Sequence, residues 1–132
     1  MKATPMLSYE DPLAMADWLV HAFGFTELER MGTHVNLDGV MLDRPSEDYV
    51  CPRRHAELCE EMRRMLDTPF VVDGVYVVVE DLEAHFARAR EAGATILSAV
   101  EDNPHVGQRQ YRAADPEGHR WFFAEPYSQT ET

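Results

Sequence analysis

One segment of the chain occurs twice. The sequence EDPLA at residues 10–14 matches EDLEA at residues 80–84, an offset of 70 residues. Each copy follows an apolar, strand-like run and precedes an amphipathic stretch that ends in glycine, Gly24 in one copy and Gly93 in the other. A supersecondary unit repeated in this way cannot bury its sheet face alone, so the two copies must pack on one another. The cleft between them is the natural place for a ligand.

The first copy, residues 4–44, is predicted to form one strand, one helix and then three strands. Asp11 is expected to cap the helix, with Pro12 at its first position, and Gly24 to end it. The predicted strands are residues 4–9, 25–31, 33–38 and 40–43.

The second copy, residues 71–126, repeats this order with a cap at Asp81 and a helix end at Gly93. Its predicted strands are residues 74–80, 95–100, 108–114 and 120–125. The last two are joined by Asp115-Pro116-Glu117-Gly118-His119, a composition typical of a tight turn. Residues 45–70 link the copies and carry an extra helix at about 52–66, and residues 127–132 form a polar tail.

Charge and length exclude several classes of function. The chain has 132 residues, with 12 Lys and Arg against 24 Asp and Glu, a net charge of −12. This charge repels phosphate backbones, so we expect no nucleic-acid partner. Apolar runs stay short of the ~20 residues that cross a bilayer, and the N-terminus lacks a secretory pattern, so we expect a cytoplasmic protein without a membrane partner.

The duplicated units, the EDLEA helix start, the AGAT sequence at residues 92–95 and the closing DPEGHRW at residues 115–121 together resemble the vicinal oxygen chelate superfamily. This superfamily contains glyoxalase I, extradiol dioxygenases and bleomycin-binding resistance proteins. The resemblance implies a single α+β glyoxalase-like domain over residues 1–132. It further implies tandem βαβββ modules that curl into a cup-shaped mixed sheet, and a homodimer.

The resemblance also places four metal-ligand positions on strands that face the cup. In this sequence these positions are Thr4, Met41, Gly74 and Phe122. A divalent cation needs imidazole, carboxylate or carbonyl donors, and this set offers one hydroxyl and one thioether. We therefore expect neither a metal nor another cofactor.

Aromatic and polar residues on the strands are the candidates for ligand binding. Aromatic walls suit planar ligands, and an arginine in the cup suits a carboxylate. Alternation along the strand puts Arg109 and Tyr111 on one face and Gln108, Gln110 and Arg112 on the other. The predicted ligand-binding residues are Met41, Tyr76, Arg109, Tyr111, Trp121 and Phe122.

Other constellations leave alternatives open. Cys51, His55 and Cys59 stand four residues apart on the extra helix, where adjacent pairs suit Zn²⁺ or a buried apolar face. His119 either contacts a ligand, acts as a base, or bonds the turn carbonyls. His85 is expected on a helix surface.

The sequence thus predicts a metal-free protein that binds a small basic or aromatic organic ligand in the cup. The alternative is an enzyme: a metal-dependent lyase or dioxygenase with non-standard ligands, or a metal-free enzyme that uses His119 or Arg109. A third hypothesis is a structural or regulatory dimer with an empty cup. Whether the chain is an enzyme, and which ligand it takes, stays open at this level.

Overall fold

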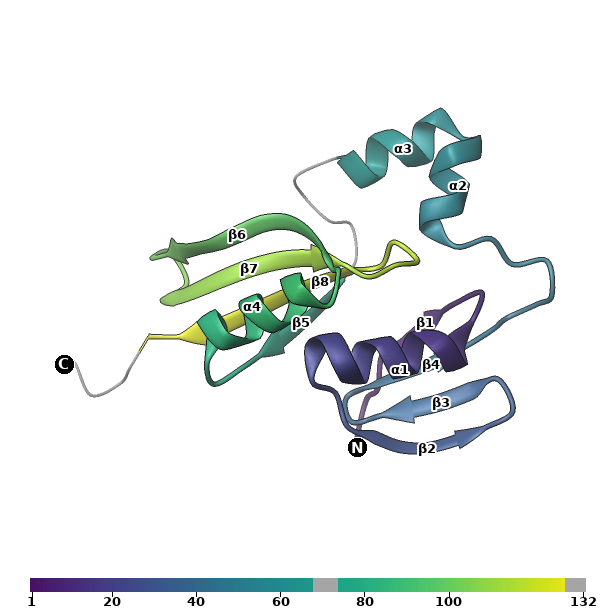
Figure 1. Cartoon of the computed structure of the whole chain (residues 1–132), viewed down its shortest axis with the longest axis horizontal. Helices are drawn as coiled ribbons and strands as arrows, with labels where there is room; N and C mark the ends of the chain where they lie inside the picture. Colours follow the sequence, from purple (N-terminus) through teal and green to yellow (C-terminus); the bar gives the residue numbers. More distant parts are fainter. Residues whose placement is uncertain (68–73, 128–132) are drawn as a thin grey trace.

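Two βαβββ modules make up most of the structure, a computed structural model that describes residues 1–67 and 74–127. In Figure 1 the modules lie side by side, with α1 next to α4. The elements of the first module are β1 (Met6–Ser8), α1 (Pro12–Phe23), β2 (Glu27–Met31), β3 (His34–Leu37) and β4 (Val40–Asp43). Those of the second are β5 (Val75–Val78), α4 (Leu82–Glu91), β6 (Thr95–Asn103), β7 (Gln108–Ala114) and β8 (Arg120–Pro126).

Each module has its own four-stranded mixed sheet. The strand orders are β1-β4-β3-β2 and β5-β8-β7-β6, so the same order is repeated in the two modules. The opening strand pairs in parallel with the closing strand in both, Met6 with Met41 and Tyr76 with Phe122. This arrangement confirms the α+β fold and the tandem βαβββ modules predicted from the repeat.

The helix starts follow from local chemistry. The carboxylates of Asp11 and Asp81 accept hydrogen bonds from the backbone N–H groups of Ala14 and Ala84, each at 3.1 Å. Gly24 ends α1 with a φ of 79°, a left-handed conformation that glycine adopts without a Cβ clash. These predicted boundaries are confirmed, since caps depend on a few neighbouring residues only.

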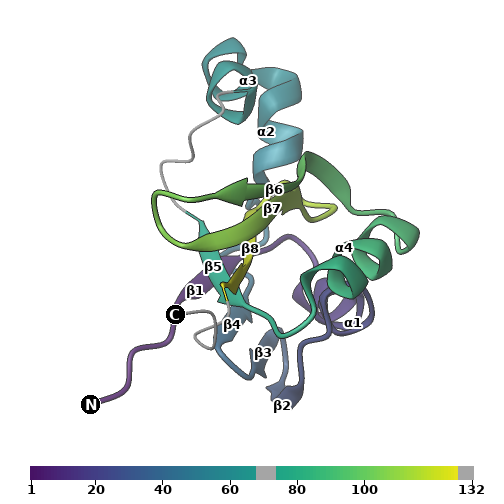
Figure 2. The same ribbon diagram turned by 90° about the vertical axis from the view of Figure 1, so that its left-hand side faces the viewer.

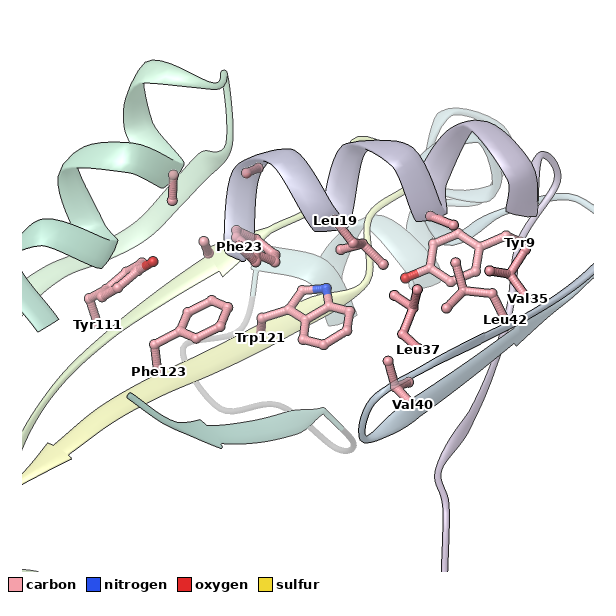
Figure 3. Packing of buried hydrophobic residues seen from close by; sticks show 14 of the residues in the cluster. Tyr9, Leu19, Phe23, Val35, Leu37, Val40, Leu42, Tyr111, Trp121 and Phe123 are labelled. Atoms are coloured by element: carbon pink, nitrogen blue, oxygen red, sulfur yellow. The ribbon is translucent and has the colours of Figure 1, made fainter. Parts of the chain in front are cut away.

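The hydrophobic core lies between the helices and one face of each sheet, and the modules share it. Figure 3 shows a row of rings beneath α1 and α4, with Tyr111, Phe123 and Trp121 from the second module. Phe23 of the first module packs edge-on against Phe123, with ring centroids 4.7 Å apart. Because Trp121 is also 5.3 Å from Phe25, the two modules bury each other's aromatic side chains.

The extra segment between the modules forms two short helices, α2 (Pro52–Leu58) and α3 (Glu60–Asp67). The prediction of one continuous helix over 52–66 was wrong, because Cys59 is extended, with φ −138° and ψ 117°. In Figures 1 and 2 this pair stands apart from α1 and α4. The predicted helix end at Thr68-Pro69 lies outside the described residues, as do residues 128–132 of the predicted tail.

The strand β6 runs to Asn103, which extends the predicted strand by three residues into the expected turn. Across the described residues, each helix is too short or too polar to cross a bilayer.

Candidate functional site

A cavity of about 610 Å³ lies where the two modules and the α2–α3 segment meet. Strand β1 and the start of β5 supply one wall, and the turn before β8 supplies another. Helix α3 adds Met62, Met65 and Leu66 from its apolar side. This volume lies within the range of ~300–1,000 Å³ that is typical of small-molecule sites.

Methionine is the commonest apolar side chain around this cavity. Met6 comes from β1, and Met62 and Met65 come from α3. Met6 is 67% exposed and Met65 is 44% exposed, so neither thioether is locked in the core. Unbranched, polarisable side chains of this kind adapt their shape to a ligand and contact aromatic rings favourably.

Two polar side chains of the lining donate to the same backbone carbonyl. His119 Nε2 lies 2.6 Å from the oxygen of Ser8, and the Tyr49 hydroxyl donates to that oxygen at 3.2 Å. Since a carbonyl oxygen only accepts, His119 carries its hydrogen on Nε2. The His119 ring also packs 4.5 Å from the ring of Tyr9, centroid to centroid. The turn thus holds His119 against β1, rather than leaving it to bond the turn carbonyls.

Arg120 is the formally charged side chain in the described lining of the cavity. Its guanidinium donates to the backbone oxygen of Met65, in the last turn of α3. This bond joins β8 to the helix that covers the cavity, and it satisfies a carbonyl that the short helix leaves open.

Behind the cavity, the turn at residues 115–119 joins the second module to the first. The Asp115 carboxylate accepts from the Tyr9 hydroxyl at 2.6 Å and from Trp121 Nε1 at 3.1 Å. Its other oxygen accepts from the backbone N–H groups of Glu117 and His119. Burial and the neighbouring Asp115 carboxylate raise the pKa of Tyr9 well above its usual value, so the phenol stays a donor.

Glu10, Cys51 and Glu117 form the one cluster of potential metal ligands among the described residues, with their ligand atoms within 4.8 Å of one another. Hydrogen bonds from the thiol and N–H of Cys51, and from Arg54, lower the pKa of Glu10 to about 2. Burial and the bond to Glu10 raise the pKa of the Cys51 thiol to about 11, which keeps it protonated.

Glu117, the third member of this cluster, is also fully engaged in hydrogen bonds within the protein. The carboxylate of Glu117 accepts from the backbone N–H groups of Glu10 and Asp11, at 2.6 Å and 3.0 Å. Burial raises the pKa of Glu117 in spite of these bonds. The cluster therefore functions as a joint between the closing turn, the start of α1 and the start of α2.

The six predicted ligand-binding residues divide between the two sheet faces. Tyr111 and Trp121 have no exposed surface and face α1 and α4 in the core. Arg109 lies on that same face, where it pairs with Glu83 of α4 at 2.5 Å and with Asp102 at 3.5 Å. Tyr111 and Trp121 are thus enclosed between helix and sheet, Arg109 is engaged by two carboxylates, and none of the three lines the cavity.

The other three residues lie on the helix-free face. Met41 pairs with Met6 of the cavity, and Tyr76 pairs with Phe122. A Cβ placed on Gly74, which also lines the cavity, would lie 3.4 Å from the Phe122 ring. Met41 and Phe122 are therefore neighbours of the lining residues Met6 and Gly74, and Tyr76, 55% exposed, follows the lining residue Val75, but none of the three lines the cavity itself.

The four positions that the resemblance assigns to metal ligands do not fit a metal ion. Thr4 lies before β1, Gly74 has no side chain, and Met41 and Phe122 offer a thioether and a phenyl ring. A divalent cation needs nitrogen, carboxylate or several oxygen donors. The chemistry of this donor set therefore gives no basis for a metal-dependent step at these positions.

The zinc hypothesis for the extra helix depended on a continuous helix. Cys51 instead precedes α2 as its N-cap residue and is buried, and Cys59 is the break before α3. His55 is exposed on α2. The spacing of four residues therefore does not place the three side chains on one helix face.

His85 was predicted as a surface residue, and this prediction was wrong. Its Nε2 lies 2.8 Å from the backbone oxygen of Phe23 and its Nδ1 lies 2.6 Å from the Tyr111 hydroxyl. Because the Phe23 oxygen only accepts, the neutral ring donates from Nε2 and accepts from Tyr111 at Nδ1. Desolvation by burial lowers the pKa of His85, which favours this neutral form.

Sequence reasoning missed Tyr49, Met62 and Met65 as cavity residues. The available signal for the two methionines was their helical spacing within the extra helix predicted at about 52–66. Its role as a cover over β1 and β5 depends on the break at Cys59, which turns α3 away from α2.

Comparison with known proteins adds evidence of family. The profile described as the Glyoxalase/Bleomycin resistance protein/Dioxygenase superfamily matches residues 4–123. An uncharacterized protein of Mycobacterium tuberculosis is 30% identical over 128 residues, which span 93% of this chain and 73% of that protein.

Solved structures agree with this match. TioX from Micromonospora sp. ML1 is 33% identical, with a TM-score of 0.69 over 97% of this chain and 98% of that chain. The fosfomycin resistance protein FosX from Listeria monocytogenes is 8% identical, with a TM-score of 0.65 over 100% of this chain and 98% of that chain. At that identity, FosX shows a shared fold alone.

Proposed function

Because this chain belongs to the glyoxalase/bleomycin resistance protein/dioxygenase superfamily, we propose that it binds a small apolar organic molecule in the cavity between β1 and β5, without a metal ion. The cavity itself carries this proposal: about 610 Å³, bordered by both modules and covered by α3. Its methionine side chains, Met6, Met62 and Met65, suit an apolar or aromatic ligand.

The chemistry of the lining favours an aromatic over a basic ligand, the two classes that the sequence left open. Arg120 places a positive charge at the cavity. A cationic ligand would meet this like charge, and the acidic cluster of Glu10 and Glu117 is engaged by Cys51, Arg54 and backbone N–H groups. The net charge of −12 is therefore an unreliable guide to the ligand's charge.

A fluorescence titration with N-phenyl-1-naphthylamine, an uncharged apolar probe, tests the proposal. We expect saturable binding that Met6→Trp weakens about tenfold, equivalent to about 1.4 kcal/mol, because the larger ring fills the space at β1. Met31→Trp is the matched control, since Met31 is 75% exposed on β2 and does not line the cavity. Equal affinity in both variants would place the probe elsewhere and contradict the proposal.

The alternative function, a metal-dependent lyase or dioxygenase with non-standard ligands, makes a different prediction. It requires a stoichiometric divalent metal, for which Glu10, Cys51 and Glu117 are the candidate ligands. Elemental analysis of the purified protein, followed by titration before and after chelation, separates the two. Our proposal expects probe binding that chelation does not change.

Assembly as a homodimer remains a prediction. Tyr76 and Val78 are 55% and 58% exposed on the helix-free face, and this apolar surface supports the prediction. Light scattering on the purified protein across a concentration series measures the oligomeric state directly. A monomer at all concentrations would remove the dimer from the proposed function.

A further inference from the structure

Resting on the proposed binding function, we infer that the ligand is an uncharged aromatic molecule with a hydrogen-bond donor, and that His119 Nδ1 accepts that hydrogen bond. The inference depends on how the polar groups of the lining are already used.

The Ser8 carbonyl accepts hydrogen bonds from two neighbouring side chains. His119 Nε2 and the Tyr49 hydroxyl both approach its oxygen, at 2.6 Å and 3.2 Å. A carbonyl oxygen has two lone pairs, so these two bonds complete its capacity. Both side chains are thereby oriented with their hydrogen atoms away from a ligand.

Both side chains still have a hydrogen-bond acceptor that a ligand can use. With its hydrogen on Nε2, the His119 ring has an acceptor at Nδ1, and no described residue bonds that atom. The Tyr49 oxygen likewise retains acceptor capacity, and burial raises the pKa of Tyr49, so the phenol keeps its hydrogen. This side of the cavity therefore presents acceptors, and a ligand that matches them must donate.

The methionine side chains of the lining favour an aromatic body for the ligand. Met6 and the α3 residues Met62 and Met65 face the same cavity. Thioether sulfur contacts aromatic ring edges with a favourable energy of ~0.3–1.5 kcal/mol. An aromatic ring between these side chains, with its donor directed at His119, satisfies the apolar and the polar parts of the lining together.

The groups that line the cavity favour an uncharged ligand. Arg120 disfavours a cationic ligand at this cavity, and the acceptors of His119 and Tyr49 disfavour an anionic group, which has no hydrogen to donate to them. A neutral donor such as a phenol or an aromatic N–H meets neither penalty.

Two probes test the inference. 2-Naphthol has a hydroxyl group that donates a hydrogen bond, and 2-methoxynaphthalene has a methoxy group that cannot donate one. We expect the wild-type protein to bind 2-naphthol about tenfold more tightly. His119→Phe should abolish this preference while it keeps a ring beside Tyr9. His55→Phe, which changes an exposed histidine on α2, is the matched control and should retain the preference.

A second measurement does not depend on affinity. In protein labelled with ¹⁵N-histidine, the His119 Nδ1 resonance should shift when 2-naphthol is added and stay in place with 2-methoxynaphthalene. Tyr49→Phe serves as a second variant in case His119→Phe does not fold, and it should reduce the preference for 2-naphthol without abolishing it.

The outcomes distinguish this inference from the proposed function. If both probes bind with equal affinity, the cavity is a binding site but the assigned acceptor is wrong. If 2-naphthoate or 2-naphthylmethylamine binds more tightly than 2-naphthol, the ligand class is charged and the inference is overturned. If none of the four binds while N-phenyl-1-naphthylamine does, the inference fails alone, and if that probe also fails, the proposed function fails with it.

Discussion

Trp18 and Arg88 occupy the same position of the repeat, 70 residues apart, and each donates to the carbonyl end of the other module's helix. Trp18 Nε1 donates to the oxygen of Ala92, after α4, at 3.3 Å. Arg88 donates through Nε to His21 at 2.8 Å and through a terminal nitrogen to Val20 at 3.1 Å, both in α1. The helix pair is therefore joined by two related contacts, made by chemically different side chains.

Replacing Arg88 by methionine should lower the free energy of unfolding by about 1 kcal/mol. The His21 carbonyl loses its side-chain donor, and the Val20 carbonyl keeps only the Gly24 N–H. The positive charge near the negative end of the helix dipole is lost as well. Urea unfolding followed by circular dichroism measures the change. Arg63→Met on α3 is the control and should stay within about 0.5 kcal/mol of the wild type.

Replacing Asp115 by asparagine should lower the free energy of unfolding by about 2–3 kcal/mol. All four bonds of this carboxylate are accepted ones, from Tyr9, Trp121 and two backbone N–H groups. Whichever way the amide is turned, its NH₂ group faces donors and leaves them unpaired inside the protein.

The control for this change is Asp102→Asn. Asp102 has a side chain that is 70% exposed and a long contact to Arg109 at 3.5 Å, so its loss should cost less than about 0.5 kcal/mol. A similar loss in both variants would mean that the Asp115 bonds do not hold the two modules together.

The local features of the fold could be predicted from the sequence because they depend on near neighbours. The caps at Asp11 and Asp81 and the glycine at the end of α1 each involve residues within one helical turn. The repeat then predicted the second module from the first. Alternation also predicted correctly that Arg109 and Tyr111 share a face.

The alternation of residues along a strand does not show which face of the sheet a helix covers. Arg109 and Tyr111 were assigned to the cup, but their face packs under α4, where the rings of Phe86 and His85 contact Tyr111. Along one strand, an aromatic residue suits a ligand wall and a core equally well. The choice depends on long-range packing that a single strand does not encode.

The cavity could not be predicted from the sequence for a similar reason. Met6 and Met65 are 59 positions apart, and only the break at Cys59 brings α3 over β1. Cys59 shows no local signal for a break, such as proline or glycine. The polar part of the site likewise depends on Tyr49 and His119 meeting at one carbonyl, from distant parts of the chain.

Stability should fall as the pH is lowered below about 6.5, the usual pKa of histidine, because His85 is held neutral. Burial lowers the pKa of His85 in the folded protein, so the unfolded chain takes up the proton first. Above about pH 6.5 this contribution is constant, and below it stability is lost until the pH reaches the lowered value.

Urea unfolding at pH 7 and pH 5.5 measures this effect. His85→Phe removes the titrating group, and although its stability at pH 7 is lower, its loss between the two pH values should be smaller than that of the wild type. His21→Phe, at an exposed position of α1, should leave the pH dependence unchanged. An unchanged slope in His85→Phe would show that another group causes the pH dependence.

Gly118→Ala should both destabilise the protein and weaken probe binding in the cavity, whereas Gly93→Ala should do only the first. The two glycines have nearly the same positive φ, 96° and 93°, so alanine carries a similar backbone strain of about 1 kcal/mol at each.

The surroundings of the two glycines differ. A Cβ at Gly118 would lie 2.7 Å from the backbone nitrogen of Arg53, and a Cβ at Gly93 would meet nothing within 4 Å. Arg53 N–H donates to Glu117 at 3.0 Å at the start of α2, so the added methyl group must push α2, and α3 with it, away from the cavity. Titration with N-phenyl-1-naphthylamine should show weaker binding for Gly118→Ala only, and equal affinities in both variants would mean that α3 does not form part of the binding site.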